Sequence, residues 1–198
     1  MDPGLLPAVN RAADRTAQWA AVALGLSIPI STALDNLLVA VVLVGWLASG
    51  AWQMKWDAIR GNRVALAALA LFGLLLLGTL YGERNPGDSV QTLRKYLDLL
   101  WIPILVWVFR DAPTRAKAVY ALAISIAAVL FLSFLVMANV IPEVRENFAY
   151  TLSATVFRTR QTHGALMAFG AFLYVQLAFA SASPRMRVLW LTLAVLAL

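Results

Sequence analysis

The sequence predicts an all-α protein, built as a polytopic bundle of transmembrane helices. Hydrophobic residues make up 62% of its 198 residues and charged residues only 13%, and the mean hydropathy is +0.78. These values lie outside the range of soluble globular domains. Apolar stretches alternate with short polar segments along the chain, which is the pattern of a multi-pass membrane protein.

The first apolar region, 17–52, is too long for a single span. As one helix it would measure about 54 Å, whereas the hydrocarbon core of a bilayer is about 30 Å thick. Pro29 and the polar pair Asp35 and Asn36 interrupt it, so we interpret it as two short spans joined by a turn. The predicted spans are 17–32, 34–52, 64–82, 90–109, 118–140, 164–182 and an incomplete one at 188–198.

The stretch 188–198 is shorter than the roughly 20 residues that a helix needs to cross a bilayer. We therefore expect six complete spans and the start of a seventh, with residues 1–198 forming the N-terminal part of one larger transmembrane domain. The span at 90–109 is expected to be one long helix that enters the membrane near Tyr96. Asp98 follows Arg94 by four residues, so we predict an intrahelical ion pair between them.

Orientation follows from the distribution of Lys and Arg, because cytoplasmic segments of membrane proteins are enriched in them. Ten of the 16 basic residues fall in alternate segments, namely Arg11, Arg15, Lys55, Arg60, Arg63, Arg110, Arg115, Lys117, Arg185 and Arg187. The other six are Arg84, Arg94, Lys95, Arg145, Arg158 and Arg160. We therefore expect a cytoplasmic N-terminus, with 83–96 and 141–163 on the outer side. Because the bases are spread between spans rather than gathered in one patch, nucleic acid is not an expected partner.

The outward segment before the span at 164–182 holds the best candidate site. Arg158, Arg160 and His163 stand within six residues of one another, on the side of the membrane where positive charge is disfavoured. Guanidinium groups bind phosphate and pyrophosphate oxygens in a bidentate manner. Arg94 and Lys95 are expected at the same face of the membrane, on another helix. Together these residues would form a cationic cradle for an anionic lipid head group.

Simpler interpretations of the same residues are open. The arginines and Lys95 would also be explained as interfacial anchors that contact phospholipid head groups. His163 is a general base, a hydrogen-bond donor to phosphate, or only a hydrogen-bonded structural neighbour.

Several kinds of site have no counterpart in the sequence. The chain contains no cysteine, which excludes disulfides and thiolate-held metals within it. No phosphate-binding loop, dinucleotide-binding fingerprint or HExxH motif occurs. The acidic residues of the outward segments are dispersed, at Glu83, Asp88, Glu143 and Glu146. We therefore expect no metal and no cofactor.

Three stretches resemble the bacterial O-antigen ligase family. They are Ser-Ile-Pro-Ile-Ser-Thr-Ala-Leu-Asp-Asn-Leu-Leu at 27–38, Lys-Tyr-Leu through Trp-Ile-Pro at 95–103, and Arg-Gln-Thr-His-Gly-Ala-Leu-Met-Ala-Phe at 160–169. The resemblance implies an integral membrane glycosyltransferase of about twelve spans, of which this chain would be the N-terminal half. Its catalytic residues are unknown and are expected beyond Leu198, in the large periplasmic loop that the family carries.

The resemblance also implies an activity in lipopolysaccharide biosynthesis. Such a ligase transfers a glycan from undecaprenyl pyrophosphate to lipid A–core at the periplasmic face of the inner membrane, without metal or ATP. Arg158 and Arg160 would bind the donor pyrophosphate, with Arg94 and Lys95 as weaker helpers. His163 would position the donor rather than act as a base. The expected partners are the lipid-linked glycan, the lipid A–core acceptor and membrane lipids.

Three other functions compete with the ligase. An O-antigen polymerase of the same superfamily would use the same arginines with another acceptor. A secondary transporter or flippase of an anionic lipid-linked substrate would also use outward arginines. Such proteins often have internal repeats and polar residues inside their spans. Neither feature is evident in this sequence. A purely structural membrane subunit would leave Arg158 and Arg160 freely replaceable.

Overall fold

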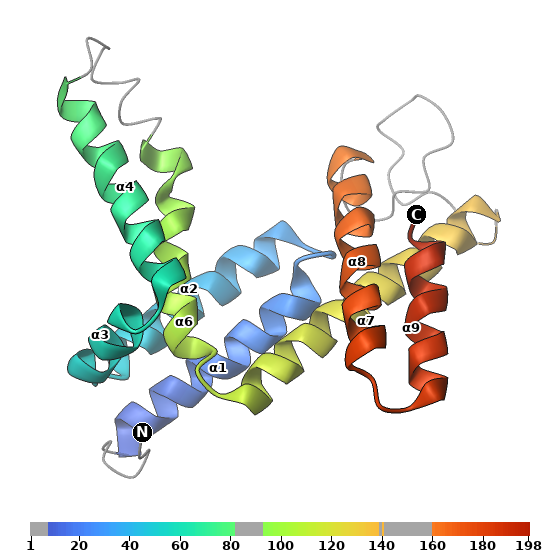
Figure 1. The fold of residues 1–198 in the computed structure, drawn as a ribbon, viewed down its shortest axis with the longest axis horizontal. Helices are drawn as coiled ribbons and strands as arrows, with labels where there is room; N and C mark the ends of the chain where they lie inside the picture. Colours follow the sequence, from blue (N-terminus) through green and yellow to red (C-terminus); the bar gives the residue numbers. More distant parts are fainter. Residues whose placement is uncertain (1–7, 82–92, 139, 141–159) are drawn as a thin grey trace. The chain divides into compact units, whose positions relative to one another are not determined.

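The computed structural model describes residues 8–81, 93–138, 140 and 160–198. Every regular element in these ranges is helical, which confirms the all-α class (Figure 1). The elements are α1 (Ala8–Ser27), α2 (Thr32–Ala48), α3 (Trp52–Arg60), α4 (Arg63–Tyr81), the 3₁₀ turn η2 (Leu97–Leu100), α6 (Trp101–Val108), α7 (Ala112–Met137), α8 (Arg160–Ala180) and α9 (Pro184–Leu196).

The predicted number of six complete spans requires correction. Within the described ranges, only α7 and α8 are long and apolar enough to cross a membrane by themselves, and a third span results if α2 and α3, bent by 112°, are one broken span. α1 falls short because its 20 residues include Arg11, Asp14 and Arg15. Arg63–Thr79, within α4, and Leu97–Val108 are apolar but shorter than α7 and α8.

The break in the first apolar region is confirmed, but its helices are shifted. α1 begins nine residues before the predicted span and ends at Ser27, and a turn containing Pro29 leads into α2. The Ser27 hydroxyl donates a hydrogen bond to the Asp35 carboxylate across this turn. Asp35 therefore stabilises the turn, as its position in the sequence suggests.

The prediction of one long helix over 90–109 is wrong in the part of it that the structure describes. The chain there forms a 3₁₀ turn before α6 begins at Trp101. Pro103 has no N–H to donate to the Leu99 carbonyl, so regular α-helical bonding cannot run through this point. Arg94 and Asp98 form no ion pair among the described residues, because regular α-helical geometry is interrupted between them at Tyr96, with φ −101° and ψ 4°.

Two segments that were expected as polar loops are helical. The segment 53–63 contains α3, which buries Lys55 and Ile59. α7 begins at Ala112, six residues before the predicted span, with Pro113 in its first turn. Proline is favoured there because the first N–H groups of a helix have no intrahelical partner. The apolar runs thus predict where these helices lie but miss their polar first turns.

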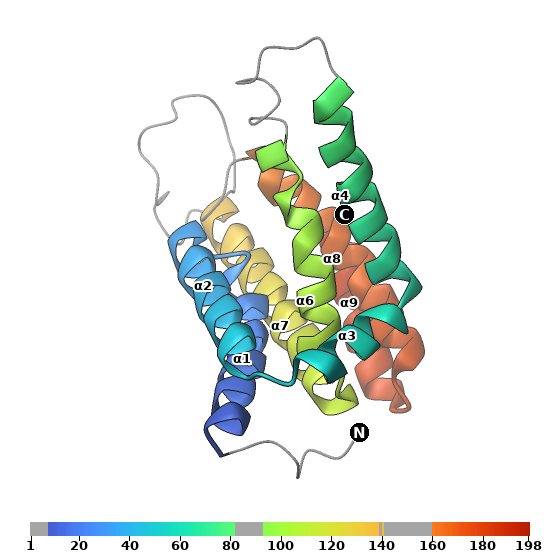
Figure 2. The same ribbon diagram turned by 90° about the vertical axis from the view of Figure 1, so that its left-hand side faces the viewer.

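The chain divides into two compact units, Met1–Ala20 with Ala40–Arg115, and Ala21–Val39 with Ala116–Leu198. In the first unit α4 lies beside η2 and α6, and α3 contacts both α4 and α6 (Figure 2). α1 and α2 approach each other closely at Gly45, where a Cβ atom would lie 2.9 Å from the Ala13 carbonyl oxygen. A small residue at this position permits the close helix contact.

The second unit has an apolar core between α7, α8 and α9, of which α8 and α9 form an antiparallel hairpin (Figure 1). Tyr174 is fully buried in this core, and its hydroxyl donates to the Ala123 carbonyl at 2.9 Å. Its ring stacks on Trp190 with the centroids 5.8 Å apart. The end of α1 joins this unit through Ser125, whose hydroxyl donates to the Leu26 carbonyl at 2.6 Å.

Candidate functional site

The start of α8 carries two of the residues that the sequence singled out. Arg160 is the first residue of this helix and His163 is the fourth. His163 is half-buried, and its Nε2 atom lies 3.5 Å from the Ser133 hydroxyl of α7, at the outer limit of a hydrogen bond. The positive end of the helix dipole lies at this turn. This turn of α8 therefore favours an anion.

The remaining predicted site residues are not assembled with that turn by any described contact. Arg158 lies outside the residues that the structure describes, as does most of the segment 141–163. Arg94 and Lys95 are consecutive, exposed residues of the first unit, just before η2. Each side chain can therefore contact a lipid head group, either as part of the predicted cationic cradle or as an interfacial anchor.

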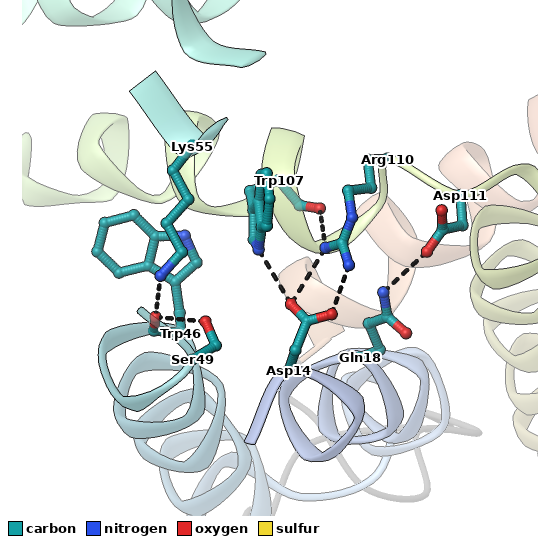
Figure 3. Close-up of polar contacts among 8 residues, drawn as sticks. All are labelled: Asp14, Gln18, Trp46, Ser49, Lys55, Trp107, Arg110 and Asp111. Carbon is teal, nitrogen blue, oxygen red and sulfur yellow. Dashed lines mark hydrogen bonds and ion pairs between the residues drawn. The ribbon is translucent and has the colours of Figure 1, made fainter. Parts of the chain in front are cut away.

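A polar cluster in the first unit was not anticipated from the sequence. It is centred on Asp14 of α1, whose side chain is only 9% exposed. Arg110 forms a bidentate ion pair with this carboxylate, and the Trp107 indole N–H donates to it at 3.0 Å (Figure 3). The Arg110 guanidinium also lies 4.2 Å from the centroid of the Trp107 ring. Three donor groups therefore satisfy one buried carboxylate.

Lys55 of α3 occupies an aromatic cage in the same unit. It is 1% exposed, and its ammonium group lies 4.5 Å from the ring centroids of both Trp46 and Trp52. The ammonium also donates to the Trp46 carbonyl near the C-terminus of α2 (Figure 3). Cation–π contacts and the carbonyl offset part of the desolvation of the charge. The cage fixes α3 against the end of α2.

The sequence offered no signal for this cluster. Asp14 and Arg110 are 96 residues apart, and Lys55 and Arg110 were interpreted only as charges that set orientation. The described donors and acceptors of the cluster are directed at one another. This arrangement suits a structural clamp between α1, α2, α3 and α6 better than it suits an open reaction site.

The helix N-terminus at the start of α8 suits anion binding. Among the residues described, no group of three or more His, Asp or Glu side chains is placed to hold a metal ion. No family model, curated protein or solved structure matches the chain.

Proposed function

We propose that this chain belongs to a membrane glycosyltransferase of the O-antigen ligase type, which transfers a glycan from undecaprenyl pyrophosphate to lipid A–core at the periplasmic face of the bacterial inner membrane. The observation that carries the proposal is the basic start of α8. There Arg160 and His163 occupy the first turn of a helix long enough to cross a membrane. The resemblance of the segments 27–38, 95–103 and 160–169 to the family supplies the reaction.

The chemistry explains why cations are needed at this position. The acceptor hydroxyl forms a new bond to the anomeric carbon of the donor, the bond from that carbon to the pyrophosphate oxygen breaks, and the lipid pyrophosphate leaves with the added negative charge. In a reaction without metal, preorganised donors must stabilise this charge. We assign Arg160, together with Arg158, to the pyrophosphate, with Arg94 and Lys95 as weaker helpers.

His163 is proposed to position the donor. One ring nitrogen lies 3.5 Å from the Ser133 hydroxyl, and the other would contact the substrate. The proton of the acceptor hydroxyl then passes to a base that we expect beyond Leu198.

The proposal is tested with the full-length protein in membranes that lack their own ligase. Glycan transfer from the undecaprenyl pyrophosphate donor to lipid A–core is compared for wild type, Arg158→Ala and Arg160→Ala at matched membrane levels. Arg187→Ala is the control, because Arg187 is an exposed arginine at the start of α9. We expect transfer without added metal or ATP, a loss of about 100-fold in rate for the first two variants, and no loss for the control.

The alternative functions give different results in the same membranes. Equal transfer by wild type and both arginine variants would make these residues interfacial anchors. Longer glycans on undecaprenyl pyrophosphate, with none on lipid A–core, would identify a polymerase. Movement of labelled donor across sealed vesicles, without any new glycosidic bond, would identify a transporter.

The role of His163 is tested separately through the pH profile. If His163 only positions the donor, His163→Gln lowers kcat and leaves the pH dependence of kcat/KM unchanged. Loss of one limb of that profile would instead make His163 a general base.

A further inference from the structure

A groove of about 620 Å³ opens in the first unit between the α3–α4 turn and α6. One wall is apolar and is formed by Ile102, Leu105 and Val106 of α6, while Gly61 and Asn62 of the turn form the other. The Asn62 side-chain oxygen accepts hydrogen bonds from the first backbone N–H groups of α4, at 3.0 and 3.1 Å. Its amide nitrogen has no partner among the described residues, so it can donate to a ligand.

One end of this groove is cationic. Arg110 and Arg115 both line it, but the charge of Arg110 is balanced by Asp14. Arg115 is exposed and donates to the carbonyls of Phe109 and Arg110, both at 3.0 Å. These bonds hold its guanidinium at the mouth of the groove. Within the described part of the chain no carboxylate pairs with it, so one full positive charge is available there.

The neighbouring helix α3 has the features of a helix at the membrane surface. It buries Lys55 and Ile59 but exposes the large rings of Trp52 and Trp56. The Arg60 guanidinium lies 4.9 Å from the centroid of the Trp56 ring. Tryptophan prefers the membrane–water interface, and a long basic side chain there directs its charge to the head groups. These features favour a position of the α3–α4 turn, and with it the mouth of the groove, at head-group depth.

We propose that this groove binds an anionic phospholipid. Its acyl chain lies along the α6 wall, and its phosphate accepts hydrogen bonds from Arg115 and from the Asn62 amide. Among the residues that line the groove, Arg115 carries the one charge that no carboxylate balances, which matches one phosphodiester better than a pyrophosphate. The distribution of Lys and Arg predicts that this face is cytoplasmic, where anionic lipids attract basic side chains. The proposed lipid site does not rest on the ligase activity.

The test measures lipid binding to the purified full-length protein by native mass spectrometry, with phosphatidylglycerol and phosphatidylcholine added in equal amounts. Wild type is expected to retain phosphatidylglycerol preferentially. Arg115→Gln keeps hydrogen-bond donors for the two carbonyls but removes the charge, and should weaken phosphatidylglycerol binding about tenfold. Arg115→Lys restores the charge and should recover most of the binding. Arg187→Gln, the control, changes an exposed arginine that also donates to a backbone carbonyl and should bind like wild type.

A second variant keeps the result interpretable if Arg115→Gln does not fold. Val106→Phe narrows the groove without changing charge, and should reduce the retention of both lipids. The proposal is overturned if the Arg115 and Val106 variants bind phosphatidylglycerol like wild type, or if Arg187→Gln weakens binding as much as Arg115→Gln. It is also overturned if undecaprenyl pyrophosphate displaces phosphatidylglycerol at a tenth of its concentration, since the groove would then be a donor-lipid site.

Discussion

Replacing Asp14 by asparagine tests whether the polar cluster holds the first unit together. The oxygen of the new side-chain amide would still accept from Trp107 and from one nitrogen of Arg110, whose present distance to Asp14 Oδ1 is 3.1 Å. The amide NH₂ would face the other guanidinium nitrogen, however, so two donors would oppose each other. The charge of Arg110 would also lose its counterion.

The size of the effect follows from the distances and the exposure. Two unit charges about 3 Å apart attract by about 5.5 kcal/mol at an effective dielectric constant of about 20. Desolvation offsets part of this, and removing one partner of a buried pair typically destabilises by about 3–5 kcal/mol. Because the Arg110 side chain is 23% exposed and can regain water, we expect Asp14→Asn to lower the free energy of unfolding by about 2–3 kcal/mol.

The assay is reversible unfolding of the full-length protein by SDS in mixed micelles, followed by tryptophan fluorescence and far-UV circular dichroism. Asp111→Asn is the matched control, because Asp111 is exposed and accepts one hydrogen bond, from Gln18 at 2.9 Å. It should change stability by less than about 0.5 kcal/mol. The double variant Asp14→Asn with Arg110→Gln removes both charges and should recover most of the loss. The reasoning fails if Asp14→Asn is as stable as the control, or if the double variant shows the sum of the two single losses.

Two further predictions concern the turn after α2 and the core of the second unit. Ala51 adopts a left-handed conformation with φ 54° directly after Gly50 with φ 61°, so Ala51→Gly should raise stability by about 1 kcal/mol. Gly50→Ala should lower stability, because alanine is strained at this φ and its Cβ would lie 2.9 Å from the Asn10 amide nitrogen. Both variants are measured by SDS unfolding, and a less stable Ala51→Gly or a more stable Gly50→Ala would contradict the assignment of strain. Tyr174→Phe removes the hydrogen bond to the Ala123 carbonyl but keeps the ring, and should lower stability by about 0.6 kcal/mol in the same assay. A loss above about 2 kcal/mol would mean that the hydroxyl does more than this one bond.

The sequence alone determined the helical class and the approximate position of most helices, because continuous apolar runs leave few alternatives in a bilayer. α4 begins and ends within one residue of the prediction. The sequence also located the break at Pro29 and the basic start of α8. It did not reveal that the polar residues just before the predicted spans 118–140, 164–182 and 188–198 form the first turns of α7, α8 and α9. Hydropathy reports burial in lipid, whereas the helix continues wherever its backbone bonds can form.

The exact helix bounds and the polar contacts were decided by the three-dimensional structure. Arg11 and Arg15 were interpreted from the sequence only as charges that set orientation, but both lie within α1, where Asp14 beside them pairs with Arg110, 96 positions later. Lys55 resembled a loop charge, yet it is buried because Trp46, Trp52 and the end of α2 meet around it. Such contacts join residues from separate helices. The local sequence does not predict these contacts, because each of the contacting residues by itself is equally suited to an exposed loop.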